Sequence, residues 1–155
     1  MAQVPRLDGT TIHASCVSVG GRGVLIRGAS GAGKSHLAFS LLLAGGAGRV
    51  PEVELVADDR VLLAPRNGQL IARAPDTLAG LIEIRGAGIR RMASRAEVAV
   101  DLVVDLGSGD AARLPEPEAQ HIVLDGVRLA RLAVLAEGDG VQQVLAMLLT
   151  DRFEG

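Results

Sequence analysis

The sequence predicts an α/β protein with a mixed β-sheet, and three features support this fold class. A glycine-rich loop lies between a short apolar strand and a segment with helical spacing, as in many α/β proteins. Predicted strands outnumber the two segments with clear helical periodicity, so a regular doubly wound sheet is not expected. A length of 155 residues fits one domain, residues 1–155, with a sizeable core.

The first elements of the chain are predicted to surround the glycine-rich loop. Residues 12–19 and 24–26 are apolar enough for two strands, and the glycine-rich residues 20–23 form the predicted turn between them. A helix is predicted at residues 34–44, because its apolar positions have helical spacing and the two following glycines suit a C-cap.

The middle of the chain reads as three further strands. Residues 53–57 form a short apolar strand that ends at two adjacent aspartates. Asn67 and Gly68 are a common pair in hairpin turns, and they separate strands predicted at residues 61–63 and 69–72.

The last third is predicted to contain two strands and one helix. Residues 98–106 alternate apolar and polar side chains, so Asp101 and Asp105 are expected on the exposed face of a half-buried strand. Residues 127–135 form another predicted strand. The apolar stripe in residues 141–149 has the spacing of an amphipathic helix.

Composition excludes several classes of partner. A net charge of −2 gives no reason to expect nucleic acid or an anionic membrane. Cys16 is the single cysteine and cannot form an internal disulfide. The N-terminus does not resemble a signal peptide, and the longest apolar stretch, residues 37–44, is too short to cross a bilayer. We expect a cytoplasmic protein, with a homo-oligomer as its assembly.

The glycine-rich loop has the pattern G-x-x-x-x-G-K-[ST], which is typical of phosphate loops. Its residues are Gly28, Ala29, Ser30, Gly31, Ala32, Gly33, Lys34 and Ser35. Backbone N–H groups in such a loop surround phosphate oxygens, the lysine neutralises the β- and γ-phosphates, and the serine hydroxyl binds Mg²⁺. The sequence therefore predicts binding of a nucleoside triphosphate and Mg²⁺. The Asn-Lys-x-Asp motif of Ras-like GTPases is absent, which favours ATP.

Two adjacent acids and one histidine are candidates for the reaction itself. Asp58 and Asp59 follow a predicted strand, where one carboxylate can hold Mg²⁺ while the other takes a proton from an attacking hydroxyl. Alternatively, Asp58 and Asp59 have no role in the reaction and only form a solvated strand end at the start of a turn. If residues 20–23 form the turn between the first two strands, His13 lies opposite Ser30 in the phosphate loop. A purely structural role for His13 is the alternative. His36 and His121 are expected to be surface residues.

Four stretches of the sequence resemble the HPr kinase/phosphorylase family. They are residues 12–17, the phosphate loop, residues 56–60 and, above all, residues 82–89, which are similar to the family signature E-[IV]-R-G-x-G. The resemblance implies a P-loop kinase fold similar to the nucleotide-binding core of phosphoenolpyruvate carboxykinase. It also implies phosphorylation of a serine of HPr, a small phosphocarrier protein, with ATP and Mg²⁺.

The resemblance also implies roles for individual residues. It gives catalytic roles to His13, Lys34, Asp59, Arg85 and Arg113. It gives metal-binding roles to Ser35, Asp58 and Glu83. Asp59 matches the acid–base aspartate of the family, and Arg113 is matched only by a looser alignment.

The sequence departs from long family members in two ways. They carry an N-terminal domain, whereas the phosphate loop here begins at Gly28, as in a short proteobacterial form. They also carry an arginine-bearing loop before the last helix, and residues 132–139 contain no arginine. Because that loop is associated with dephosphorylation, we expect little phosphorylase activity. A small-molecule P-loop kinase and a non-catalytic ATP-binding sensor remain alternatives.

Overall fold

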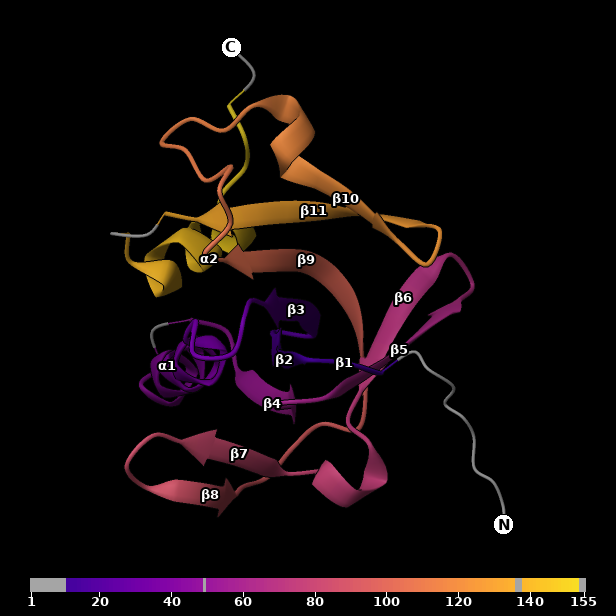
Figure 1. The fold of residues 1–155 in the computed structure, drawn as a ribbon, viewed down its shortest axis with the longest axis vertical. Coiled ribbons are helices and arrows are strands. Elements are labelled where there is room, and N and C mark those ends of the chain that lie inside the picture. Colours follow the sequence, from indigo (N-terminus) through magenta and orange to yellow (C-terminus); the bar gives the residue numbers. More distant parts are fainter. Residues whose placement is uncertain (1–10, 49, 136–137, 154–155) are drawn as a thin grey trace.

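The computed structural model describes residues 11–48, 50–135 and 138–153 (Figure 1). The helices are α1 (Lys34–Gly46) and α2 (Gly140–Leu149), and two short 3-10 helices span Asp76–Leu78 and Pro117–Gln120. The strands are β1 (Thr11–Ile12), β2 (Ala14–Val19), β3 (Arg22–Arg27), β4 (Val53–Ala57), β5 (Val61–Arg66), β6 (Gln69–Arg73), β7 (Leu81–Ile84), β8 (Gly88–Arg91), β9 (Val98–Leu106), β10 (His121–Leu124) and β11 (Val127–Val134).

Nine of these strands form one curled, mixed sheet, which confirms the predicted fold class. Seven strands have the order β1-β5-β6-β9-β3-β2-β4. In addition, β11 pairs with β9, and β10 pairs with β11. The long strand β9 bends, so that its first residues pair with β6 and its later residues lie between β3 and β11 (Figure 1). β3, β9 and β11 are parallel, so their carboxyl ends lie at one edge of the sheet.

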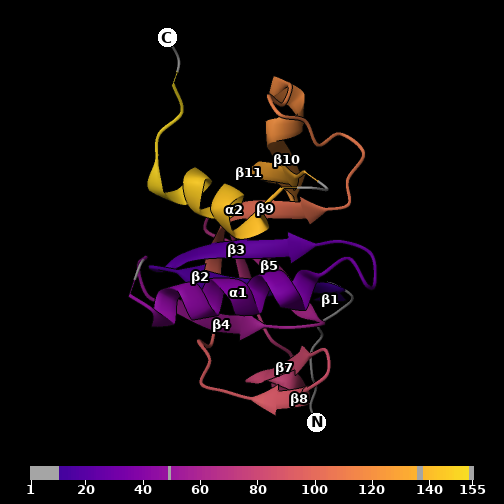
Figure 2. The same cartoon turned by 90° about the vertical axis from the view of Figure 1, so that its left-hand side faces the viewer.

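Two apolar clusters lie on opposite faces of this sheet. Both helices cover one face (Figure 2), where residues such as Ile26, Leu41 and Val144 are fully buried. The second cluster includes Cys16 and Leu70 and lies under the β5–β6 hairpin. Aliphatic side chains fill both clusters. Within the described ranges, no helix combines the length and the apolar character needed to cross a bilayer.

The predicted register of the first hairpin was wrong by two residues. Val19 pairs with Arg22 rather than Val24, and the turn consists of Gly20 and Gly21 alone, with φ values of 58° and 88°. Such positive φ values at both turn positions favour glycine and give a tight hairpin. A shift of two residues leaves the same side chains buried. However, the ladder ends at Ala14, so His13 has no strand partner in the phosphate loop.

Three strands were missed because their sequences lack a clear apolar alternation. β7 and β8 form a separate two-stranded hairpin in which every residue of β8 is exposed. Figure 1 shows this hairpin apart from the large sheet, on the side of α1 opposite α2. The short strand β10 was also missed. The predicted helix at residues 34–44 continues to Gly46, with Ala47 as its C-cap.

The prediction that Asp105 is exposed was also wrong. The carboxylate of Asp105 accepts hydrogen bonds from Arg27 (2.8 and 2.9 Å) and from Nε of Arg131 (2.6 Å). Burial alone would raise the pKa of Asp105, but the hydrogen bonds from these two arginines hold that pKa below its usual value. Arg27 directly precedes the phosphate loop. Its hydrogen bonds to Asp105, which also binds Arg131, therefore fix the start of the loop to β9 and β11. Asp101, by contrast, is exposed and paired with Arg22.

Asp105→Asn is expected to lower the free energy of unfolding by about 2–3 kcal/mol at about pH 7, because two arginines lose a charged acceptor. Folding lowers the pKa of Asp105. The contribution of its carboxylate to the free energy of unfolding is therefore complete above the unfolded-state pKa of about 4, and it is lost as the pH falls through the folded-state pKa. Denaturant unfolding of both proteins at about pH 7 and about pH 3 measures this difference. An equal difference at both pH values would contradict the assignment. In the control Asp101→Asn, we expect less than about 1 kcal/mol.

Candidate functional site

The phosphate loop connects the end of β3 to the first residue of α1. Gly31 and Gly33 have φ values of 86° and 100°, which other residues adopt only with strain, and Gly33 is the N-cap of α1. The Lys34 ammonium lies against the loop, where it donates to the carbonyl oxygens of Gly28 (2.9 Å) and Ala29 (3.1 Å). The loop therefore has the open backbone and the adjacent cation that phosphate binding needs.

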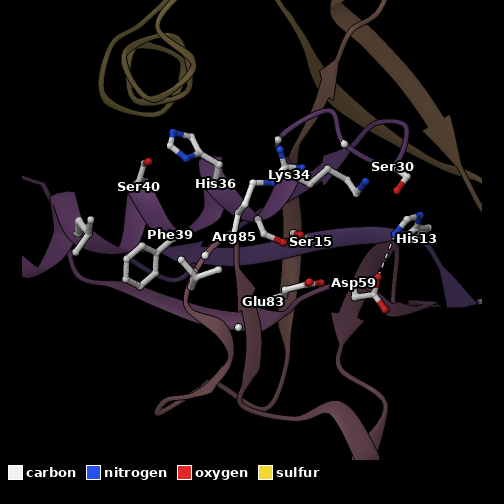
Figure 3. Close-up of a pocket in the computed structure, with 17 residues that line it drawn as sticks. His13, Ser15, Ser30, Lys34, His36, Phe39, Ser40, Asp59, Glu83 and Arg85 are labelled. Atoms are coloured by element: carbon white, nitrogen blue, oxygen red, sulfur yellow. Dashed lines mark ion pairs between the residues drawn. The ribbon is translucent and has the colours of Figure 1, made fainter.

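A cleft of about 720 Å³ lies between α1 and the β7–β8 hairpin (Figure 3). It brings together nine of the residues predicted for the site: His13, Ser30, Gly31, Gly33, Lys34, Ser35, Asp59, Glu83 and Arg85. Phe39, Leu43 and Ile84 contribute apolar side chains to its lining. His36, predicted as a surface residue with no role, also lines this cleft.

Asp58 is buried beside the phosphate loop, with 3% of its surface exposed. Its Oδ1 accepts a hydrogen bond from Oγ of Ser15 (2.6 Å), and Oγ of Ser35 lies 2.8 and 2.9 Å from the two carboxylate oxygens. The backbone N–H of Glu83 donates to Oδ2 at 3.1 Å. Asp58 thus connects β4 to β2, to the start of α1 and to β7, and these partners are all uncharged donors.

These residues fit a divalent cation that is shared with a phosphate ligand. A buried carboxylate with uncharged partners favours a nearby cation, and Mg²⁺ commonly takes one or two carboxylates together with phosphate and water oxygens. Ser35 and Asp58 supply a hydroxyl and a carboxylate, and the Glu83 side chain extends into the same cleft (Figure 3). Among the described residues, no three His, Cys, Asp or Glu side chains form a metal site by themselves. Phosphate and water oxygens would complete the coordination of a Mg²⁺ ion held by these residues.

Asp59 has an unusual backbone conformation that directs it into the cleft. Its φ value is 70°, and the N–H of Arg60 donates to the carbonyl oxygen of Asp58 at 2.8 Å, which closes a γ-turn of the strained, positive-φ kind. Nε2 of His13 lies 3.0 Å from Oδ1 of Asp59 (Figure 3). Both side chains are largely exposed, so their ion pair contributes little to stability. Strained residues of this kind often occur at functional sites.

Arg85 and Arg113 differ in position. Arg85 follows β7 and lines the cleft that contains Lys34 and Asp59. Arg113 is exposed in the connection between β9 and β10 and does not line the cleft. Its catalytic role stays a prediction that rests on the looser alignment.

Sequence reasoning missed one buried residue of the site. Ser15 is completely buried in β2, and its hydroxyl holds the carboxylate of Asp58. The available signal was a hydroxyl side chain in an otherwise apolar strand. Such a residue needs a buried hydrogen-bond partner.

Comparison with known proteins identifies the family. The model of the HPr serine kinase C-terminal domain matches residues 7–116, which is more than half of the chain. The chain belongs to the HPr serine kinase family. This match includes the phosphate loop, the acidic pair and the β7–β8 hairpin, and the predicted resemblance is therefore confirmed.

Individual relatives agree with membership of the HPr serine kinase family. An HPr kinase/phosphorylase of Clostridium beijerinckii is 42% identical over 80 residues, which cover 52% of this chain and 24% of the relative. One of Geobacillus kaustophilus is 38% identical over 120 residues, covering 72% and 34%. The chain thus spans a quarter to a third of these curated relatives. The solved Hpr(Ser) kinase/phosphatase of Coxiella burnetii superposes with a TM-score of 0.70 at 26% identity, covering 90% of this chain and 93% of that one.

Asp59→Gly is expected to raise the free energy of unfolding by about 1 kcal/mol, because relief of the positive-φ strain exceeds the entropy that glycine adds to the unfolded chain. Arg60→Gly, the matched control at an ordinary backbone position, is expected to lower it. Urea unfolding of the three proteins checks both signs. Equal destabilisation by the two glycines would show that the backbone of Asp59 is not strained.

Proposed function

We propose that this chain is an ATP- and Mg²⁺-dependent protein-serine kinase that phosphorylates a serine of an HPr-like phosphocarrier protein. The observation that carries the proposal is the Asp59–His13 pair, 3.0 Å apart, in the cleft that Lys34 and Ser35 also line. Membership of the HPr serine kinase family supports the choice of a protein serine as acceptor. We further propose that residues 1–155 form one catalytic domain of a cytoplasmic homo-oligomer.

Asp59 acts as the general base in this proposal. The acceptor hydroxyl gives its proton to the Asp59 carboxylate as its oxygen attacks the γ-phosphorus, and the bond to the β-phosphate oxygen breaks to release ADP. His13 orients the carboxylate through its contact with Oδ1. The 63% exposure of the Asp59 side chain leaves it accessible to a hydroxyl on a protein surface.

Two cationic side chains and a metal ion neutralise the charges of the triphosphate in this proposal. Lys34 lies at the phosphate loop, and Arg85 extends from the β7–β8 hairpin into the same cleft. Mg²⁺, when held by Ser35, Asp58 and Glu83, supplies further neutralisation of the β- and γ-phosphates. Positioned cations of this kind stabilise the charge of a phosphoryl-transfer transition state.

Two other functions are consistent with a phosphate loop, and one experiment separates them. A small-molecule kinase would transfer phosphate to a metabolite, and an ATP-binding sensor would transfer none. Incubation with γ-labelled ATP, Mg²⁺ and candidate HPr-like proteins tests all three. We expect label on a serine of one carrier. Label on no carrier, together with ATP consumption that depends on an added metabolite hydroxyl, would instead support the small-molecule kinase.

Asp59→Asn is expected to retain ATP binding and to lose phosphate transfer by about 10²–10⁴-fold, because the amide cannot accept the hydroxyl proton. Initial rates of carrier labelling measure the loss, and calorimetric titration with ATP measures binding. Asp101→Asn is a matched control at an exposed position on β9 and should keep the wild-type rate. Activity of Asp59→Asn within a few fold of wild type would exclude Asp59 as the base.

The enzyme is expected to act mainly as a kinase, with little phosphorolysis of the phosphorylated carrier. Phosphorolysis brings orthophosphate beside a seryl phosphate, and these two anions repel each other unless extra cations are present. Residues 132–139 contain no arginine that could supply such cations. Ala136 and Glu137 of this segment lie outside the described residues. Incubation of the phosphorylated carrier with orthophosphate and Mg²⁺ should release pyrophosphate far more slowly than the forward reaction proceeds. Comparable rates in both directions would contradict the expectation.

A further inference from the structure

Four charged side chains of alternating sign form a row across the neighbouring strands β3, β9 and β11 (Figure 1). This charge row consists of Arg27 on β3, Asp105 on β9, Arg131 on β11 and Asp110 in the segment after β9. Val104 packs in the apolar cluster under the helices and Val103 in the other cluster. Because side chains alternate along a strand, Asp105 lies on the face of the sheet opposite the helices.

Arg131 lies at the centre of the charge row, and 11% of its side chain is exposed. Its Nε donates to Asp105 at 2.6 Å. Its two terminal nitrogens donate to the carboxylate of Asp110 (2.8 and 3.1 Å), to Oγ of Ser108 (3.0 Å) and to the carbonyl oxygen of Ala119 (2.9 Å). A planar guanidinium with this many acceptors has a fixed orientation. Arg131 therefore holds the connection between β9 and β10 on one side and Asp105 on the other.

Asp105 extends the charge row to the phosphate loop. Arg27 donates to both of its carboxylate oxygens, a two-bond contact that fixes orientation as well as distance. The next residue, Gly28, lies so close to β9 that a Cβ atom on it would be 3.2 Å from the Cβ of Leu106. The start of the phosphate loop is thus held against β9 by an ion pair and by close packing.

The first two residues of the phosphate loop hold the catalytic cation. The carbonyl oxygens of Gly28 and Ala29 accept the hydrogen bonds of the Lys34 ammonium. A displacement of Arg27 moves both acceptors, because they follow it directly in the chain. Neither Arg27 nor Arg131 lines the catalytic cleft, so their influence on a bound phosphate is indirect.

We propose that Arg131 is a positioning residue for phosphoryl transfer, which sets the place of the Lys34 ammonium through Asp105 and Arg27. This inference rests on the proposed binding of a triphosphate at the phosphate loop. Without Arg131, the carboxylate of Asp105 loses one of its two charged partners and the orientation in which it binds Arg27. Small displacements of a positioned group have large effects on phosphate binding and on rate.

Titration calorimetry with Mg²⁺–tripolyphosphate tests the proposal, because this ligand depends on the phosphate loop and the metal site alone. Arg131→Met removes the guanidinium and keeps an apolar stem, and we expect it to weaken affinity by about tenfold. Arg131→Lys keeps the charge without the planar fork, and we expect a smaller loss of about threefold. Arg128→Met, at an exposed position of the same strand, should leave affinity unchanged.

Wild-type affinity in a folded Arg131→Met protein would overturn the proposal. Denaturant unfolding shows whether each variant is folded. If Arg131→Met does not fold, Arg131→Lys decides the question, and wild-type affinity in that variant would equally overturn the proposal.

Asp110→Asn separates positioning from a general loss of stability. It weakens the contact of Arg131 with the β9–β10 connection and leaves the contact with Asp105 in place. We expect Asp110→Asn to unfold at lower denaturant concentration than the wild-type protein and to keep tripolyphosphate affinity within about twofold. Equal losses of affinity in Asp110→Asn and Arg131→Met would show that loosening of the fold, rather than the position of Lys34, weakens binding.

A double-mutant cycle tests whether Arg131 acts through Asp105. Asp105→Asn alone should weaken tripolyphosphate binding by about tenfold, and the addition of Arg131→Met should weaken it further by less than about twofold. Independent losses that multiply to about a hundredfold would contradict this route. Failure of the wild-type protein to bind tripolyphosphate or ATP would instead refute the proposed function.

Discussion

The buried carboxylate of Asp58 is the contact on which the arrangement of the site depends. Its hydrogen bonds to Ser15, Ser35 and the backbone of Glu83 join four elements that are distant in the sequence. Without these donors, the charge would be buried at a cost of several kcal/mol. Because Ser35 is the first-turn residue that follows the phosphate-loop lysine, the same contact sets the position of α1 relative to β4. A cation beside Asp58 would complete the neutralisation that uncharged donors leave unfinished.

The two adjacent aspartates illustrate how one strand end can supply two different chemical groups. Asp58 continues the direction of β4 and is buried, whereas the positive φ of Asp59 turns the next carboxylate toward solvent and His13. A buried acid with fixed donors suits a structural or metal-binding role, and an exposed acid suits proton transfer to an incoming hydroxyl. The strain at Asp59 is tolerated because β4 and β5 hold both ends of the turn.

Much of this architecture could be predicted from local pattern, and the rest depends on contacts between distant residues. The phosphate loop, α1 and the alternating strand β9 follow from glycine spacing and apolar periodicity, and they were predicted nearly to the residue. The burial of Asp105 was not predictable, because it requires Arg27 and Arg131 from two other strands. The different environments of Asp58 and Asp59 likewise depend on Ser15 and on a backbone angle that no residue pattern encodes. The family signature located Glu83 and Arg85 in the sequence but gave no sign of the exposed hairpin that carries them.

The most direct test of this account is the Mg²⁺ dependence of ATP affinity in Asp58→Asn, measured by titration calorimetry with and without Mg²⁺. In the wild-type protein, Mg²⁺ should strengthen ATP binding. In Asp58→Asn, affinity without Mg²⁺ should be retained while most of the Mg²⁺-dependent gain is lost, because the phosphate loop and Lys34 remain intact. Lys34→Ala should instead weaken binding under both conditions. An unchanged Mg²⁺-dependent gain in Asp58→Asn would contradict the central role of this carboxylate.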